Sequence, residues 1–165
     1  MKLIHLSQGF SAIVDDADFD WLNQHKWTVQ ATKHSRTQYA YRNIYGFGKI
    51  VRIVMHRAIL SPPDDLEVDH IDGNGLNNQR TNLRLCTHAE NCRNMRIDRK
   101  RKNPQCRFKG VTFYTALSYP CWTAKISTPQ GCKNLGYFST PEEAARAYNE
   151  AARKLFGEFA RLNPL

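Results

Sequence analysis

Two sequence patterns mark the starts of helices in this chain. Thr87-His-Ala-Glu90 and Thr140-Pro-Glu-Glu143 are capping boxes, in which a hydroxyl residue is followed three positions later by glutamate. Pro141 suits the first position of the second helix, because the N–H that proline lacks would have no partner there. The residues before each box are rich in β-branched and aromatic side chains and are broken by turns. The chain is therefore predicted to be an α+β protein, in which short strands lead into each helix.

The first half of the chain is β-rich. Runs of β-branched and aromatic residues are separated by polar or glycine-containing segments such as Gly46-Phe-Gly48. Asp72-Gly-Asn-Gly75 has the composition of a tight turn, and the first capping box predicts a helix from about His88. We predict a short helix over 16–26 and strands at 10–14, 28–31, 39–42, 50–55 and 66–71.

The second half also places strands before a helix. Three strands are predicted at 110–114, 122–127 and 135–138, with turns at Pro120 and at Gln130-Gly131. Gly157 is a suitable end for the helix that Thr140 begins. Its apolar stripe is predicted to consist of Ala144, Tyr148, Ala151 and Leu155. Residues 100–108 are expected to link two modules, at 1–99 and 109–165.

The chain is basic, and the excess charge is local. Its 165 residues include 24 Lys and Arg against 15 Asp and Glu, a formal net charge of +9. Residues 91–110 carry eight basic side chains and one acidic, whereas the charges of residues 1–90 cancel. A solvated segment is one interpretation. A phosphate-binding stretch is the other, because each neutralised phosphate releases counterions. Charge alone is compatible with DNA, RNA or an anionic membrane surface.

Composition argues against several classes of protein. No apolar run approaches the ~20 residues of a membrane helix, and the N-terminus has no signal-peptide core. We therefore expect a soluble, cytoplasmic protein. The five cysteines form no C-x-x-C pair, so no structural zinc is expected and free thiols are the default.

Residues 69–91 concentrate groups suited to hydrolysis. They are Asp69, His70, Asn82, His88 and Asn91. Carboxylate and amide oxygens are ligands for a hard cation such as magnesium, and a neutral imidazole can take a proton from water near pH 7. An ordinary turn explains the same composition at least as well. In a regular strand, moreover, neighbouring side chains such as Asp69 and His70 point to opposite faces.

A family resemblance favours the catalytic interpretation. Residues 50–95 closely resemble HNH nucleases, most of all the phage and intron-encoded homing endonucleases. The matching segments are Met55-His56-Arg57, Val68-Asp-His-Ile-Asp-Gly-Asn74, Asn77-Asn78, Asn82-Leu-Arg84 and Thr87-His-x-Glu-Asn91. The resemblance implies a ββα-metal finger over 55–95. The position of the last letter of H-N-H is Asn91 here rather than histidine.

The resemblance also implies residue roles. His70 would be the general base, and Asn82 would orient its imidazole. Asp69 and Asn91 would hold one Mg²⁺ or Mn²⁺ ion beside the scissile phosphate. We expect His56 to pack beneath the site and His88 to lie at the surface. The DNA-contacting residues expected in this module and the following basic run are Arg57, Arg84, Arg93, Arg96, Arg99, Lys100, Arg101 and Lys102.

Residues 109–163 carry a second resemblance, to the Apetala-two/ethylene-response-factor DNA-binding domain. The matching features are Leu135-Gly-Tyr-Phe138 and the alanine-rich helix after Thr140. The resemblance implies a three-stranded antiparallel sheet packed on one helix, with the exposed sheet face on DNA. Plant members have more arginine on that face and tryptophan where this chain has Asn134. The candidate contacts are Lys109, Thr112, Lys125, Ser127 and Lys133.

Together these features predict a metal-dependent HNH DNA endonuclease of homing or freestanding phage type. One active site per chain predicts nicking by a monomer or weak dimer. The expected partner is double-stranded DNA, with no membrane and no small-molecule substrate. A DNA-binding regulatory protein with a non-catalytic HNH scaffold is the alternative, and RNA binding is a third class that neither module favours.

Overall fold

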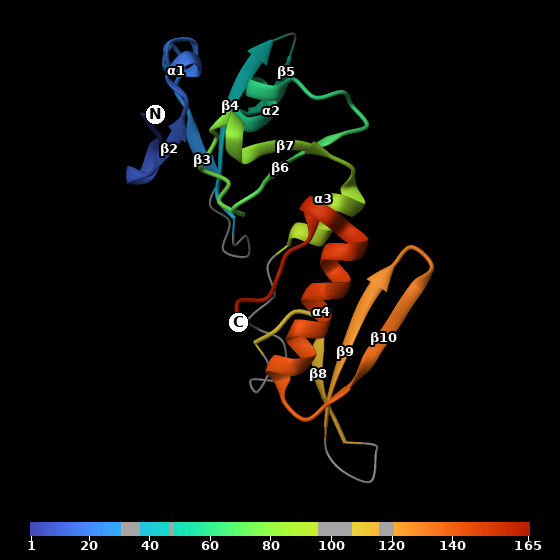
Figure 1. Cartoon of the computed structure of the whole chain (residues 1–165). Coiled ribbons are helices and arrows are strands. Elements are labelled where there is room, and N and C mark those ends of the chain that lie inside the picture. Colours follow the sequence, from blue (N-terminus) through green and yellow to red (C-terminus); the bar gives the residue numbers. More distant parts are fainter. Residues whose placement is uncertain (31–36, 47, 96–106, 116–120) are drawn as a thin grey trace. The chain divides into compact units, whose positions relative to one another are not determined.

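The computed structural model describes residues 1–30, 37–46, 48–95, 107–115 and 121–165 (Figure 1). The chain divides into two compact units, Met1–Cys92 and Arg93–Leu165, and each has its own apolar core. The linker expected at 100–108 lies mostly outside the described residues. Small antiparallel sheets and helices make up both units, so the α+β prediction is confirmed. Within the described residues, no helix is long and apolar enough to cross a membrane.

The first unit opens with a hairpin and a helix. β1 (Lys2–His5) pairs antiparallel with β2 (Ser11–Val14), and α1 (Asp16–Asn23) follows directly. Val14 and Leu22 are buried in the core of the unit. The indole of Trp27, also buried, donates to the carbonyl oxygen of Leu22 at 2.8 Å, so its polar atom is satisfied.

A three-stranded sheet follows. β3 (Thr28–Gln30), β4 (Tyr39–Gly46) and β5 (Lys49–Val54) are antiparallel neighbours in that order. The chain enters α2 (Met55–Leu60) with no loop between them. Met55 and Ile59 are buried, because residues four apart share one face of a helix. The strand expected at 50–55 is thus confirmed, but α2 was not predicted, since six residues are too few to show a helical period.

The first unit ends in a second hairpin and the start of a helix. β6 (Glu67–His70) pairs antiparallel with β7 (Leu83–Cys86), and α3 (His88–Asn94) follows. The loop between the strands includes a 3-10 turn at Arg80–Asn82. The predicted capping box is present: Glu90 N–H donates to Thr87 Oγ1 at 3.3 Å, and Thr87 N–H donates to Glu90 Oε2 at 2.8 Å.

The second unit is a three-stranded sheet that carries one helix, as the sequence predicts. β8 (Val111–Tyr114), β9 (Cys121–Thr128) and β10 (Gly131–Phe138) are antiparallel, with β9 in the centre. α4 (Pro141–Phe156) packs on this sheet, and a 3-10 turn at Gly157–Phe159 follows. The core combines strand and helix residues, among them Val111, Ala124, Ile126, Ala144, Ala145, Tyr148 and Ala152.

The ends of α4 agree with the sequence, but its apolar stripe differs. Thr140 and Glu143 cap each other's backbone N–H groups, and Gly157 caps the C-terminus with φ of 52°. The prediction that Leu155 continues the stripe is wrong, because its side chain is 49% exposed. The last fully buried residue of α4 is Ala152, and Phe156 is partly buried against the same core.

The approach to β8 requires a glycine. Gly110 has φ of +74°, and a Cβ atom there would lie 2.2 Å from Tyr148 Cδ2 and 2.5 Å from the Lys125 carbonyl oxygen. The C-terminal segment closes over the same end of the unit. Asn149 and Asn163 exchange two hydrogen bonds, of 2.9 and 2.7 Å, through side chain and backbone. These contacts position the strand that begins the candidate DNA-binding sheet.

Candidate active site

The β6–β7 hairpin has two chemically different faces. Asp69 is directly opposite Arg84, and His70 is directly opposite Leu83. Neighbouring strand residues point to opposite faces, whereas directly opposed residues share one. Asp69 and Glu67 therefore share a carboxylate face, and His70 lies on the imidazole face. The sequence left open whether Asp69 and His70 could act together. The strand directs their side chains to opposite faces, and His70 is its last residue, so joint action requires the turn that follows.

On the imidazole face, His70 is held by an asparagine. Its Nε2 lies 3.3 Å from Asn78 Oδ1, and both side chains are buried, at 4% and 0% exposure. A carbonyl oxygen only accepts, so this hydrogen bond places the ring proton on Nε2 and leaves Nδ1 as the basic nitrogen. Burial lowers the pKa of His70 below its usual value, against smaller opposing effects of Asn78, Asp72 and Asp69. The imidazole is therefore neutral at pH 7.

The backbone of β2 places Asn78. Ile13 N–H donates to the Leu76 carbonyl oxygen, and Asn78 N–H donates to the Ile13 carbonyl oxygen, both at 2.8 Å. The loop between β6 and β7 is thus fastened to the N-terminal hairpin beside His70. In the sequence Asn78 is one of two adjacent asparagines in a turn. No signal there distinguishes it, because its partner depends on a contact with a strand more than sixty residues earlier.

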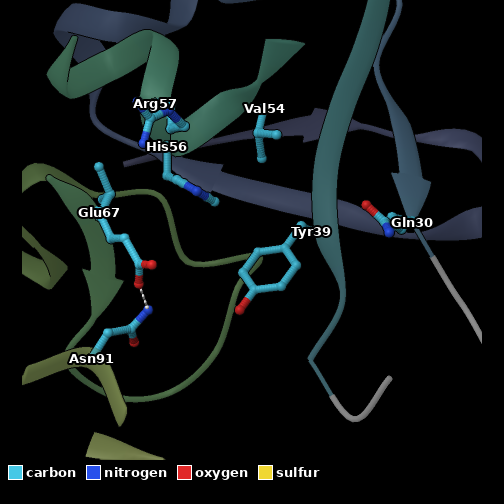
Figure 2. A pocket seen from close by; sticks show the side chains of 8 residues that line it. Gln30, Tyr39, Val54, His56, Arg57, Glu67 and Asn91 are labelled. Atoms are coloured by element: carbon cyan, nitrogen blue, oxygen red, sulfur yellow. Dashed lines mark hydrogen bonds between the residues drawn. The ribbon is translucent and has the colours of Figure 1, made fainter. Parts of the chain in front are cut away.

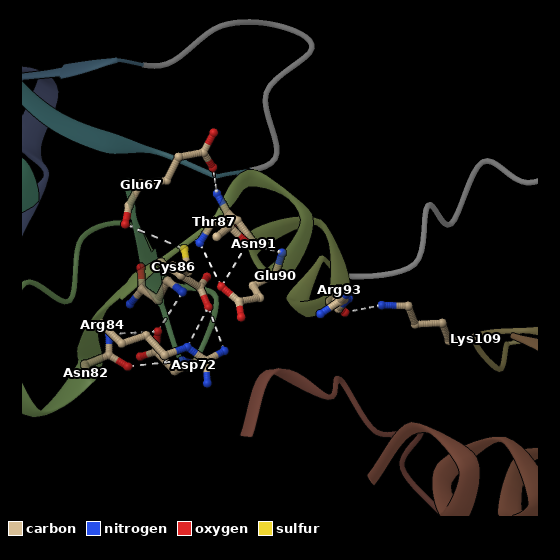
Figure 3. A network of polar contacts seen from close by, with 12 residues as sticks. Glu67, Asp72, Asn82, Arg84, Cys86, Thr87, Glu90, Asn91, Arg93 and Lys109 are labelled. Atoms are coloured by element: carbon tan, nitrogen blue, oxygen red, sulfur yellow. Dashed lines mark hydrogen bonds and ion pairs between the residues drawn. The ribbon is translucent and has the colours of Figure 1, made fainter. Parts of the chain in front are cut away.

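Asn82 closes the same loop and does not bond to His70. Its Nδ2 donates to Asp72 Oδ1 at 3.0 Å and to the Asn77 carbonyl oxygen at 2.8 Å, while its Oδ1 accepts from Asp72 N–H at 3.1 Å (Figure 3). The expectation that Asn82 orients the imidazole therefore differs from the structure, where Asn78 makes that contact. Since every polar atom of the Asn82 amide is used within the loop, its effect on His70 passes through the loop.

Two aromatic rings pack against His70. The His56 and His70 ring centroids are 4.9 Å apart with an interplanar angle of 88°, and Tyr39 lies 5.4 and 5.7 Å from them. Burial, with the charge of His70 and Arg57 as smaller causes, lowers the pKa of His56 to about 3. His56 therefore stays neutral and packs beneath the site, as the sequence suggested.

On the carboxylate face, Asp69 is paired with Arg84. The Arg84 Nε and Nη2 groups donate to Asp69 Oδ2 at 3.0 and 2.7 Å. The two side chains are only 7% and 10% exposed. Arg84 was expected to contact DNA, but in this arrangement its guanidinium neutralises a buried carboxylate.

Glu67 and α3 complete the carboxylate face. Asn91 Nδ2 donates to Glu67 Oε2 at 2.6 Å (Figures 2 and 3). His88 Nδ1 lies 2.8 Å from Glu67 Oε1. These two hydrogen bonds lower the pKa of Glu67 below its usual value, and the one from Asn91 has the larger effect. His88 is exposed, as expected. Sequence reasoning missed Glu67, although its spacing of two from Asp69 places both carboxylates on one strand face.

A cavity of about 230 Å³ lies beside these groups (Figure 2). It is lined by residues from both faces of the site and from the neighbouring sheet, namely Gln30, Tyr39, Val54, His56, Arg57, Glu67, Val68 and Asn91. The cavity thus joins the α3 amide to the aromatic group around His70. Arg57, another expected DNA contact, lines it and donates from Nη1 to the Leu66 carbonyl oxygen at 3.1 Å.

The donor set suits a hard cation that keeps several waters. Asp69 and Asn91 each offer oxygen, the ligand type that Mg²⁺ and Mn²⁺ prefer. Mg²⁺ needs only one or two protein carboxylates when water and phosphate complete its shell. Within the part of the chain that the structure describes, no group of three or more His, Cys, Asp or Glu side chains could hold a metal. Asp69 and Asn91 are thus the two oxygen donors that would hold such a cation.

Several expected DNA contacts of the basic run are in the second unit or outside the described residues. The Arg93 guanidinium lies 4.7 Å from the Phe156 ring centroid. Lys109 Nζ donates to the carbonyl oxygens of Arg93 and Met95 (Figure 3). These two cations therefore have intramolecular partners. Arg96, Arg99, Lys100, Arg101 and Lys102 are among the residues that the structure does not describe.

One face of the sheet in the second unit is exposed and carries both hydroxyl and lysine side chains. Thr112, Lys125 and Ser127 are exposed on it. Lys133 is directly opposite the buried Ile126, so its side chain starts from the face that carries α4. Lys133 therefore does not share a face with Lys125, whose partner across the sheet is Asn134.

Two tyrosines occupy the same exposed face. Tyr114 and Tyr137 have ring centroids 5.5 Å apart and are opposite Cys121 and Thr123 of β9. Strand alternation puts both on the side of Lys125. They were not singled out from the sequence, since pairing between β8, β9 and β10 was needed to bring them together.

Comparison with known proteins identifies the family. Residues 61–93 match the model of a family described as HNH endonuclease. The chain is 33% identical over 169 residues to a protein of Acanthamoeba polyphaga mimivirus named as an uncharacterized HNH endonuclease, covering 99% of this chain and 80% of that protein. No solved structure matches.

Part of the chain is also similar to plant proteins. It is 44% identical over 64 residues to the dehydration-responsive element-binding protein 2E of Oryza sativa subsp. japonica, covering 38% of this chain and 19% of that protein. It is 46% identical over 63 residues to protein 2D of that name in Arabidopsis thaliana, covering 37% and 29%. The chain thus spans less than a third of these plant proteins. The mimivirus protein, in contrast, aligns along nearly the whole chain, and the family model coincides with β6, β7 and α3. The chain therefore belongs to the HNH endonuclease family and is an endonuclease.

Proposed function

We propose that this endonuclease is metal-dependent and hydrolyses phosphodiester bonds of double-stranded DNA, with β6, β7 and α3 as a ββα-metal unit. The observation that carries the proposal is the His70–Asn78 contact of 3.3 Å. It leaves a neutral imidazole with Nδ1 as the basic atom, at the end of the strand that also bears Asp69.

In this mechanism, His70 accepts a proton from the attacking water at Nδ1. Its lowered pKa keeps the base largely unprotonated at neutral pH. Asp69 and Asn91 hold one Mg²⁺ or Mn²⁺ ion. When bound, such an ion stabilises the negative charge that develops on the phosphate and the leaving oxygen. Asn78 keeps the imidazole in its productive tautomer, and Asn82 keeps the loop closed around it.

We assign DNA retention to the second unit. Its resemblance to plant DNA-binding domains over 109–163 and its exposed Thr112, Lys125 and Ser127 support this assignment. A covalent link to such a unit raises the effective concentration of the catalytic unit on DNA. Lysines and hydroxyls suit phosphate contacts, so we expect affinity from this face more than strict base recognition. One active site per chain predicts nicking, by an enzyme of homing or freestanding type.

The test is relaxation of supercoiled plasmid by the full chain. Mg²⁺ should convert the plasmid to the open circle, EDTA should stop the reaction, and His70→Ala should slow it about 10²- to 10⁴-fold. Asn78→Ala should slow it, whereas Asp65→Asn, an exposed change two residues from β6, should not. Relaxation that persists in EDTA would contradict the proposal.

Two observations favour a second candidate function. His70 is only 4% exposed, and plant proteins named as dehydration-responsive element-binding proteins match part of the chain. A protein that binds DNA without cutting it would have both properties. Gel-shift and nicking assays on the same DNA separate the two: a regulatory protein would bind with Mg²⁺ present and never nick.

A further inference from the structure

Glu67 lies on the carboxylate face of the proposed metal site, and the mechanism above does not use it. It is the first residue of β6, two residues before Asp69. Successive residues of a strand advance about 3.3 Å, so the Cα atoms of Glu67 and Asp69 are about 7 Å apart on one face. Its carboxylate meets α3 at both oxygens, through Asn91 and His88.

The hydrogen bond to Glu67 decides which way the Asn91 amide faces. An ionised carboxylate has no hydrogen to donate, so it can only face the amide nitrogen. The Nδ2–Oε2 distance of 2.6 Å is that of a strong, charge-assisted hydrogen bond. Rotation of the amide by 180° would place two oxygens against each other. Glu67 therefore fixes Nδ2 on itself and leaves Oδ1 as the ligand atom.

We propose that Glu67 is a positioning residue for the metal site, which orients Asn91 so that its amide oxygen binds the cation. This inference rests on the proposed metal-dependent function. Mg²⁺ and Mn²⁺ bind oxygen, and a reversed amide would present an NH₂ group that repels them. Without Glu67 both orientations become accessible, and metal binding must select one of them.

His88 restrains Glu67 from the other side. Its Nδ1 lies 2.8 Å from Glu67 Oε1, while Asn91 uses Oε2. With both oxygens engaged by one helix, the carboxylate cannot rotate away from Asn91. Because His88 is exposed, this second contact is weaker in water, and we expect a smaller effect from its loss.

The test measures Mn²⁺ binding to the full chain in the presence of duplex DNA. All variants carry His70→Ala, so that the DNA stays intact, and free Mn²⁺ is followed by electron paramagnetic resonance. Glu67→Ala should weaken Mn²⁺ binding about 10- to 100-fold, the usual effect of losing a group that orients a ligand. Glu67→Gln keeps one acceptor and should lose less. Asp65→Asn removes the same charge from an exposed neighbour and should match the parent.

A second substitution at Asn91 separates orientation from ligation. Aspartate presents oxygen in either rotamer and needs no orientation. Asn91→Asp should therefore restore Mn²⁺ binding in the Glu67→Ala background to within about threefold of the parent. In the presence of Glu67, the same change opposes two carboxylates and should weaken binding. Thermal melting of each variant shows whether it is folded.

Three results would overturn the inference. They differ in whether the proposed function also fails. If Glu67→Ala binds Mn²⁺ like the parent, Glu67 does not orient Asn91, and the proposed function stands. If binding is lost but Asn91→Asp does not restore it, Glu67 is itself a ligand. If the parent binds no Mn²⁺ with DNA present, both the metal-dependent function and this inference fail.

Discussion

Replacing Arg84 with methionine tests the buried ion pair with Asp69. Asp69 is 7% exposed, and two guanidinium nitrogens donate to its Oδ2 at 3.0 and 2.7 Å. An exposed ion pair contributes about 0–1 kcal/mol, but removing one partner of a buried pair leaves an uncompensated charge. Arg84→Met is therefore expected to lower the free energy of unfolding of the first unit by about 3–5 kcal/mol.

Urea unfolding followed by tryptophan fluorescence measures this change. A Trp122→Phe background restricts the signal to Trp21 and Trp27, which lie in the first unit. Lys2→Gln is the matched control, since Lys2 forms an exposed pair with Asp20 at 3.9 Å. It should change the free energy of unfolding by less than about 1 kcal/mol.

A divalent cation should partly compensate the loss of Arg84. If Asp69 binds metal, Mg²⁺ can neutralise the carboxylate that the guanidinium no longer covers. Addition of Mg²⁺ should therefore raise the urea midpoint of Arg84→Met more than that of the parent. A loss below about 1 kcal/mol would refute the reasoning about the buried pair. Equal midpoint shifts in both proteins would refute the placement of metal at Asp69.

Three further predictions follow from other parts of the structure. The lowered pKa of His56, about 3, means that unfolding takes up a proton below pH 6.5. As the pH falls from 7 to 5, His56 should therefore lower the free energy of unfolding by about 2 kcal/mol. In urea titrations, His56→Phe should remove this part of the pH dependence. Gly110→Ala should destabilise the second unit by more than about 2 kcal/mol, because φ is +74° and the added Cβ would meet Tyr148. Gly46 has open space around it, so Gly46→Ala should change the melting temperature little, and thermal melts compare the two variants. Burial raises the pKa of Cys86 to about 11, so iodoacetamide at pH 8 should modify the exposed Cys92 and leave Cys86 unmodified. Peptide mass mapping measures both modifications, and rapid labelling of Cys86 would contradict its burial.

Local signals in the sequence predicted much of the fold. The capping boxes at Thr87 and Thr140 each specify a helix start through contacts within four residues, and both are present. Runs of β-branched and aromatic residues likewise located strands in both units, but β1 and β7 were not predicted. α2 was not predicted, because it is short and follows a strand without a break. Its conformation depends on the tertiary packing of Met55 and Ile59.

The candidate site was predictable in its residue types and less so in its contacts. Asp69 and His70 lie on β6 and Asn91 lies on α3, and their roles remain a proposal. The partner of His70 was assigned to Asn82, whereas the structure uses Asn78. Both are asparagines of one loop, and the backbone bonds from Ile13 decide between them. Such long-range contacts have no local signature.

The most direct test of the account is the single-turnover nicking rate of His70→Ala with saturating protein and Mg²⁺. A general base contributes about 10²- to 10⁴-fold to rate. The account predicts a loss of that size while affinity for the same DNA, measured by gel shift, stays within about threefold. A His70→Ala protein that nicks at nearly the parent rate would contradict the assignment of His70 as the base and, with it, the proposed active site.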